Sequence, residues 1–136
     1  MAEEFRLQKA ERFIAAAQSA FEHRHWEACA SRAYYAVYHL VVALIVMRHA
    51  AMGRRPKRPV SEWHHIPVRN GFLILFSDRG FFFSTRDGAD YADLLAMREA
   101  ADYQDSRFDR RLARRALETA EKLASKMRDA LERNLR

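Results

Sequence analysis

The sequence predicts an all-α fold, an antiparallel up-and-down bundle of four or five helices. The chain has 136 residues, the length of one domain, so we expect residues 1–136 to form a single unit. Four glycines and three prolines are too few for the many turns of a sandwich or barrel. Apolar residues recur at steps of three and four over several long segments, the period of helices that share one core.

The N-terminal half contains the two clearest helices. Residues 3–23 show one apolar face, and residues 25–51 are apolar on nearly all sides until Gly53 and Pro56 end the helix. The longest apolar stretch, 33–47, has 15 residues. This is shorter than the ~18–20 residues that a membrane span needs, so we expect a buried helix and no membrane partner.

The middle of the chain is less regular. Ser61 is expected to cap a third helix, although Phe72–Phe76 would also suit a short strand. Residues 80–88 predict an irregular link, in which Phe81–Phe83 is too apolar to be exposed and is expected to pack in the core or a dimer contact. A fourth helix should follow over 89–104.

The last predicted helix, 107–135, has the most regular apolar period, and Ser106 with Asp109 resembles a capping pair. Its first turns are strongly basic. We interpret this run of arginines as a solvent-exposed face, whose positive charge is partly offset by neighbouring acids. The run consists of Arg107, Arg110, Arg111, Arg114 and Arg115.

Charge and cysteine content narrow the function classes. The formal net charge is +6, with a sequence pI of about 9.9, which points weakly to an anionic partner. One cysteine, Cys29, excludes an internal disulfide framework and fits a reducing compartment. The acidic start of the chain lacks the basic-then-apolar order of a signal peptide, so we expect a cytoplasmic protein.

Two polar side chains on the second helix form the main candidate site. At about 100° per residue, Arg32 and His39 lie on one narrow stripe with Ala36 and Ala43 between and beyond them. The rest of this helix is apolar or aromatic, so the two polar side chains do not serve solubility. The two small alanines leave room for a ligand or for a closely packed second helix.

An arginine and a histidine suit phosphodiester chemistry. Histidine can give or take a proton near neutral pH, and arginine can bind phosphate oxygens in two places at once. RNA carries its own nucleophile in the 2′-hydroxyl, so no metal or cofactor is expected. The alternative is structural: His39 is a core histidine with its hydrogen bonds satisfied, and Arg32 pairs with an acid such as Asp102.

Three segments in order resemble the HEPN superfamily. The segment from Ser31 to His39, SRAYYAVYH, is similar to the S-R-x-Y-Y-A-x-F-H pattern of a prokaryotic branch. His64 or His65 then precedes an apolar segment, and residues 98–103, REAADY, resemble that branch's R-x-x-A-D-Y. With the long last helix, the resemblance covers residues 5–135.

The resemblance implies a helical bundle, often a homodimer, in which an arginine, a short spacer and a histidine form a ribonuclease site. Six residues separate Arg32 from His39. One His39 would act as base on the 2′-hydroxyl and its mate would protonate the leaving oxygen, giving a 2′,3′-cyclic phosphate, while Arg32 stabilises the transition state. Where many active members carry a polar residue after the arginine, this chain has Ala33.

The resemblance also leaves a second function open. The branch includes proteins that bind RNA or a nucleotide without catalysis, or that dock a nucleotidyltransferase. The two hypotheses are therefore a toxin-type endoribonuclease held by a cognate nucleotidyltransferase-type antitoxin, and a non-catalytic nucleotide-binding or partner module.

Further residues are expected around the Arg32–His39 pair. Asp102 could orient either side chain, although it could also form an ordinary helical ion pair with Arg98. The residues expected to support the pair are Tyr35, Arg98, Asp102 and Tyr103.

A basic loop after the second helix could hold RNA phosphates through Arg54, Arg55, Lys57 and Arg58. No histidine spacing matches a zinc motif, so no metal site is expected.

Overall fold

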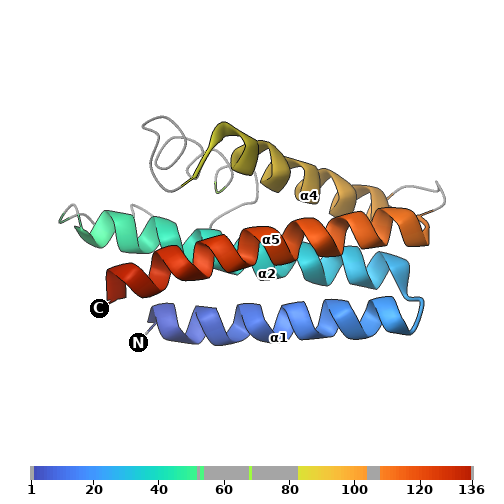
Figure 1. Ribbon diagram of the computed structural model, residues 1–136, viewed down its shortest axis with the longest axis horizontal. Helices are drawn as coiled ribbons and strands as arrows, with labels where there is room; N and C mark the ends of the chain where they lie inside the picture. The colour runs from blue at the N-terminus through green and yellow to red at the C-terminus, as the bar shows by residue number, and fades with distance from the viewer. Residues whose placement is uncertain (1, 52, 54–67, 69–82, 104–107, 136) are drawn as a thin grey trace.

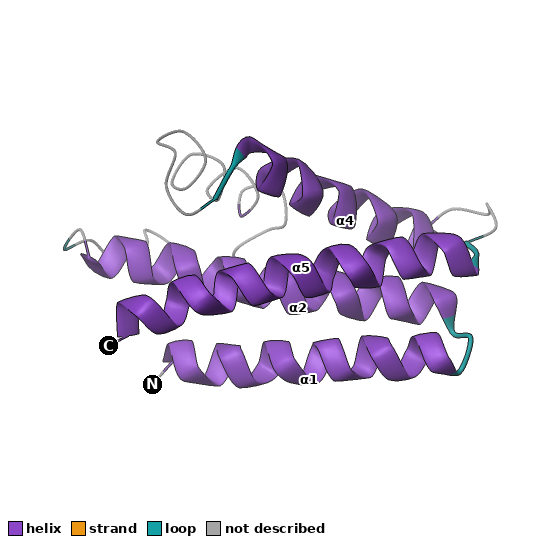
Figure 2. Ribbon diagram, in the orientation of Figure 1, coloured by secondary structure: helices purple, strands orange, loops and turns teal. Residues whose placement is uncertain are grey.

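The computed structural model confirms the all-α prediction. It describes residues 2–51, 53, 68, 83–103 and 108–135, and these ranges contain helices and loops but no strand (Figure 2). The helices are α1 (Ala2–Glu22), α2 (Trp26–Ala51), α4 (Thr85–Tyr103) and α5 (Arg110–Leu135). The helix or strand predicted around residues 61–76 lies outside the described residues, except for Val68, which is buried.

Successive helices alternate in direction, as an up-and-down bundle requires. In Figure 1, α1 and α4 run one way and α2 and α5 run the other, and both described chain ends lie at the same end of the bundle. α2 packs against all three other helices, and α5 also packs against α1 and α4. α2 is therefore the central element of the described fold.

The turn between α1 and α2 has a defined backbone geometry. The His25 amide donates to the Ala20 carbonyl at 2.8 Å, and Arg24 has a φ of 62°, in the left-handed region that often ends a helix. The His25 carbonyl accepts the first hydrogen bond of α2 from the Cys29 amide. The bounds predicted for the two helices agree with this turn to within one residue.

α4 begins earlier than predicted. We expected residues 80–88 to form an irregular link, but α4 starts at Thr85 and Gly88 lies in its first turn. The cause is a capping box: the Ser84 amide donates to Asp87 Oδ2 at 2.9 Å, and the Asp87 amide donates to Ser84 Oγ at 3.3 Å. Phe83, just before the box, is buried, in agreement with the prediction of core packing.

α5 begins later than predicted, at Arg110 instead of residue 107. Asp109 caps it, because its Oδ1 accepts a hydrogen bond from the Leu112 amide at 3.0 Å. Phe108, the residue before this cap, is buried and anchors the chain to the core. Ser106, the other half of the expected capping pair, lies outside the described residues.

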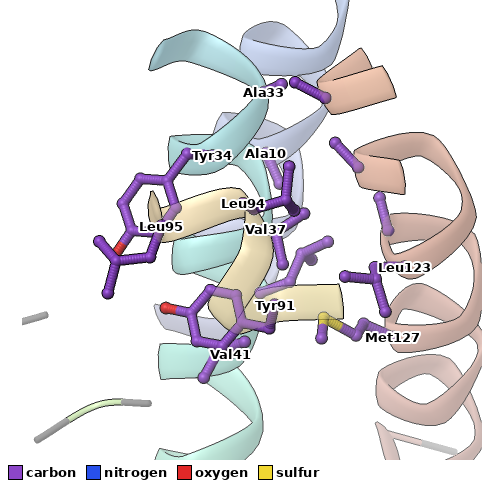
Figure 3. Close-up of a cluster of buried hydrophobic side chains, with 14 of the residues drawn as sticks. Ala10, Ala33, Tyr34, Val37, Val41, Tyr91, Leu94, Leu95, Leu123 and Met127 are labelled. Atoms are coloured by element: carbon purple, nitrogen blue, oxygen red, sulfur yellow. The ribbon is translucent and has the colours of Figure 1, made fainter. Parts of the chain in front are cut away.

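The core lies where α2 meets α4 and α5 (Figure 3). Val37 and Val41 of α2 are fully buried, as are Leu123 and Met127 of α5. The rings of Tyr34 and Tyr91 stack with a 5.9 Å separation between centroids and 2° between planes, joining α2 to α4. The α1 side is filled by small side chains, which let α1 approach α2 closely: Ala10, Ala17 and Ala20.

The apolar character of α2 comes from this central position. The window Trp26–Arg48 has 23 residues and a mean hydropathy of 1.5, so by length and composition it could cross a membrane, and the expectation that the stretch is too short for a span was wrong. However, 67% of that window is buried inside the bundle. A helix covered on most sides by other helices has this composition in the core of a globular protein.

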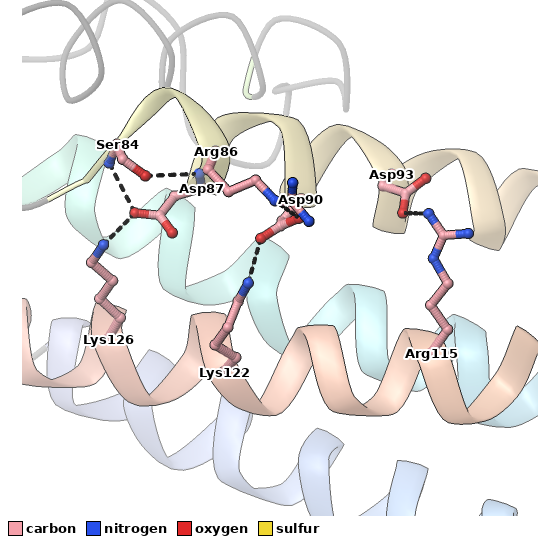
Figure 4. Close-up of polar contacts among 8 residues, drawn as sticks. All are labelled: Ser84, Arg86, Asp87, Asp90, Asp93, Arg115, Lys122 and Lys126. Atoms are coloured by element: carbon pink, nitrogen blue, oxygen red, sulfur yellow. Dashed lines mark hydrogen bonds and ion pairs between the residues drawn. The ribbon is translucent and has the colours of Figure 1, made fainter.

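A row of ion pairs joins α4 to α5 (Figure 4). Acidic side chains spaced three apart on α4 each face a cation on α5. The pairs are Asp87 with Lys126, Asp90 with Lys122 at 2.6 Å, and Asp93 with Arg115 at 2.5 Å. We call this row the α4–α5 ladder.

Candidate functional site

Arg32 and His39 line one open pocket, with a volume of about 550 Å³. α2 forms most of its wall, α1 contributes one aromatic ring and α4 contributes one carboxylate. The lining residues are Phe13, Glu27, Ala28, Ser31, Arg32, Tyr35, His39 and Asp102. We call this cavity the Arg32–His39 pocket. Its walls therefore combine one cation, one imidazole, two acids and two aromatic rings.

The room in this pocket does not come from the alanines that the sequence suggested. Ala36 and Ala43 are fully buried, and neither lines the pocket. Ala28 and Ser31, which precede Arg32 on the helix, are the small side chains that open the cavity. The pocket therefore lies beside Arg32 and His39 on the side of α2 that carries Ala28 and Ser31. Ala36 and Ala43 instead pack inside the bundle.

His39 is half-buried and held between α1 and α2. Its ring stacks on Phe13 with 5.5 Å between centroids, and its Nδ1 lies 3.4 Å from Nη1 of Arg6. Burial, together with the charges of Lys9 and Arg6, lowers the pKa of His39 from 6.5 to about 4. The imidazole is therefore uncharged at neutral pH in the free protein.

Arg32 is exposed and extends between two cavities. Besides the Arg32–His39 pocket, it lines a second cavity of about 280 Å³ at the α1–α2 turn, together with Ser19, His23 and His25. Within the part of the chain that the structure describes, no acidic side chain forms an ion pair with Arg32. The structural alternative, in which Arg32 pairs with Asp102, is therefore not observed.

Asp102 is held by its own helix. Its Oδ2 accepts a hydrogen bond from Arg98 Nε at 3.2 Å, which is the helical ion pair that the sequence left open. The Arg98 guanidinium lies over the rings of Tyr34 and Tyr35, 5.6 and 5.5 Å from their centroids. Arg98 thus links the Asp102 side of the pocket to the Tyr35 side.

Several predicted residues lie apart from this pocket or outside the described structure. The basic loop of Arg54, Arg55, Lys57 and Arg58 is not among the described residues, and nothing is described of the Tyr103 side chain beyond its place at the end of α4. In the basic run of α5, Arg110 and Arg114 lie over the Phe21 ring, at 5.6 and 5.8 Å. These two arginines therefore pack on α1 as well as facing solvent.

Sequence reasoning missed three residues on α1: Arg6, Lys9 and Phe13. They are spaced three and four apart, so they share one helical face, and that face meets His39. The spacing was readable in the sequence, but nothing in it indicated which face of α1 meets α2. No group of three or more potential metal ligands occurs in the described ranges.

The fold and the pocket define a helical-bundle protein with an arginine and a histidine, two turns apart on its central helix, at one open site. A family model described as the HEPN domain matches residues 3–57. This range holds nearly all of α1, the whole of α2, and both Arg32 and His39, so this part of the chain is similar to HEPN domains. No curated protein matches the chain.

Proposed function

We propose that this protein is a metal-independent endoribonuclease that cleaves RNA at the Arg32–His39 pocket. One observation carries the proposal: the Arg–His pair lies within the HEPN-matched segment and lines a single open cavity beside two aromatic rings. A HEPN domain is consistent with RNase or nucleotide-related function.

The chemistry follows from the side chains. The Arg32 guanidinium can bind two phosphate oxygens and offset the charge that develops when the 2′-hydroxyl attacks. His39 is the proton-transfer group, and Phe13 and Tyr35 offer faces on which a base can stack. Since one histidine cannot act on both oxygens at once, we propose a homodimer in which two pockets act on one phosphodiester. The setting that we propose is cytoplasmic, with a cognate nucleotidyltransferase-type partner as antitoxin.

The test is RNA cleavage in EDTA by the wild type, Arg32→Ala and His39→Ala. We expect wild-type cleavage to give 2′,3′-cyclic phosphate and 5′-hydroxyl ends, and each variant to lose at least about 100-fold in rate. Arg111→Ala, which removes an exposed arginine of α5, is the matched control and should retain the wild-type rate. Absence of cleavage at protein concentrations that sustain a dimer would refute the nuclease proposal, and equal cleavage by all four proteins would refute the assignment of the site.

The state of His39 favours a second candidate, a nucleotide-binding or RNA-binding module that docks a nucleotidyltransferase. A pKa of about 4 is far below the value at which a histidine best transfers protons at neutral pH. Fluorescence anisotropy with a labelled RNA separates the two candidates. Under this alternative the wild type binds RNA and leaves it uncut, and Arg32→Ala weakens binding.

A further inference from the structure

Arg6 reaches the candidate site from α1, outside the segment that carries the Arg–His pattern. Its Nη1 lies 3.4 Å from His39 Nδ1, a contact between residues 33 positions apart in sequence. The ring of Phe13 stacks on the face of the imidazole. The imidazole is thus fixed by one cation at its edge and one ring at its face.

The contact determines where the imidazole carries its proton. A guanidinium has five N–H donors and no acceptor, so it can meet Nδ1 favourably only when that nitrogen presents its lone pair. A neutral imidazole with an unprotonated Nδ1 carries its proton on Nε2. The nitrogen that remains for a ligand in the pocket is therefore an N–H donor.

We propose that Arg6 is a positioning residue that holds His39 as a neutral imidazole with its proton on Nε2. The position of the proton is a property of the free protein. Only its consequence for catalysis rests on the proposed function. In that state His39 can donate a hydrogen bond to a phosphate oxygen or to a leaving oxygen. It cannot accept the proton of a 2′-hydroxyl at Nε2 until Arg6 leaves Nδ1.

The surroundings of His39 support Arg6 as the group that selects the proton position. Lys9 also lowers the pKa of His39, but it acts through its charge, whereas Arg6 also places a guanidinium nitrogen 3.4 Å from Nδ1. The other charged or titratable neighbours come from α2 and α4 and line the same pocket or flank the ring; they are Tyr38, Tyr35, Arg32, Glu27 and Asp102. Asp102, the acid from α4, is paired with Arg98.

The competing explanation is that burial and the nearby positive charges keep His39 neutral without selecting which ring nitrogen carries the proton. Arg6 and Lys9 differ in this respect, because each removes one charge from α1 when replaced but Arg6 also supplies the donor at 3.4 Å. Arg6→Met and Lys9→Met are therefore matched variants with similar apolar replacements, one turn apart on the same helix.

The experiment is a pH titration of the full chain, labelled with ¹⁵N in histidine, followed by two-bond ¹H–¹⁵N NMR. For the wild type we expect the Nε2–H form and titration near pH 4. In Arg6→Met the proton should distribute over both ring nitrogens, and the pKa should rise only in part, because burial and Lys9 still lower it. In Lys9→Met we expect a rise in pKa at least as large, because the charge of Lys9 lowers the pKa more than that of Arg6, but with the Nε2–H form retained.

Two results would overturn the inference: a wild-type His39 protonated on Nδ1, or the same proton position in Arg6→Met as in the wild type. Neither result depends on cleavage, so failure of the nuclease proposal in the EDTA assay leaves this test standing. Where cleavage does occur, the acidic limb of the rate–pH profile should move to higher pH in Arg6→Met, and an unchanged limb would also contradict the role of Arg6.

Discussion

Two of the helix interfaces of this protein, α4–α5 and α1–α2, arrange their charged side chains in opposite ways. On the α4–α5 ladder every acid of α4 in the row faces a cation of α5, and Asp87 also closes the cap of α4 (Figure 4). On the α1–α2 side, burial lowers the pKa of the His39 imidazole, and the charges of Lys9 and Arg6 lower it further. The first interface matches its charges, and the second gathers like charges.

This difference separates residues that hold the fold from residues that are available to a ligand. Exposed matched pairs contribute modestly to stability, and removing one partner of a buried pair is strongly destabilising because the other charge is left buried without compensation. Gathered cations repel one another and depress the charge of a neighbouring histidine, which is unfavourable until an anion binds between them. Violations of local charge matching are expected at functional sites.

The largest effect should come from breaking the ladder at Asp87. This side chain is 7% exposed, caps α4 through Ser84 and pairs with Lys126, so Asp87→Ala removes the cap and leaves a half-buried cation without its partner. We expect a loss of about 2–3 kcal/mol in the free energy of unfolding, measured by urea denaturation.

Asp93→Ala is the matched control on the same ladder. Its partner Arg115 is 60% exposed at the side chain and Asp93 is 37% exposed, so solvent screens the pair and the expected loss is below about 1 kcal/mol. Equal losses at the two positions would show that the ladder contributes through exposed charge alone and that the cap of α4 does not matter.

The second prediction separates the two interfaces by pH. In the unfolded chain His39 protonates near pH 6.5 but in the fold only near pH 4, so stability falls as the pH drops through this window. We expect the wild type to lose about 1–2 kcal/mol more than His39→Gln between pH 7 and pH 4, after allowing for screening of the half-buried ring.

The ladder should respond in a lower window. Burial alone would raise the pKa of Asp87, but hydrogen bonds from Lys126 and Ser84 outweigh it and hold the pKa below the ordinary 3.8. The contribution of this carboxylate is therefore complete above pH 3.8 and is lost only below it. Urea midpoints measured from pH 7 to 3 check both windows, and parallel curves for the wild type and His39→Gln above pH 4 would contradict the account of His39.

The sequence was informative where a pattern is local and poor where partners are distant. The period of apolar residues predicted four of the helices, and their ends were missed only where a cap decided them, as at Ser84 with Asp87. The placement of Arg32 and His39 on one side of α2 was also predictable, because a helix fixes the relation of residues seven apart. The contact of Arg6 with His39 was not predictable, because it depends on which face of α1 packs against α2. That choice is made by the packing of the small side chains of α1.

The smallest effect on stability, and the sharpest contrast with Asp87, is expected at Arg32. Its side chain is exposed and has no acidic ion-pair partner in the described part of the chain, so Arg32→Ala should change the free energy of unfolding by no more than about 0.5 kcal/mol. The same variant should weaken RNA binding, measured by fluorescence anisotropy, because the guanidinium that faces both cavities is removed. Asp93→Ala, which lies on the matched interface, should leave RNA binding unchanged. If Arg32→Ala instead lowered the free energy of unfolding and left RNA binding intact, Arg32 would be a residue that stabilises the fold. The α1–α2 interface would then not be the one that faces a ligand.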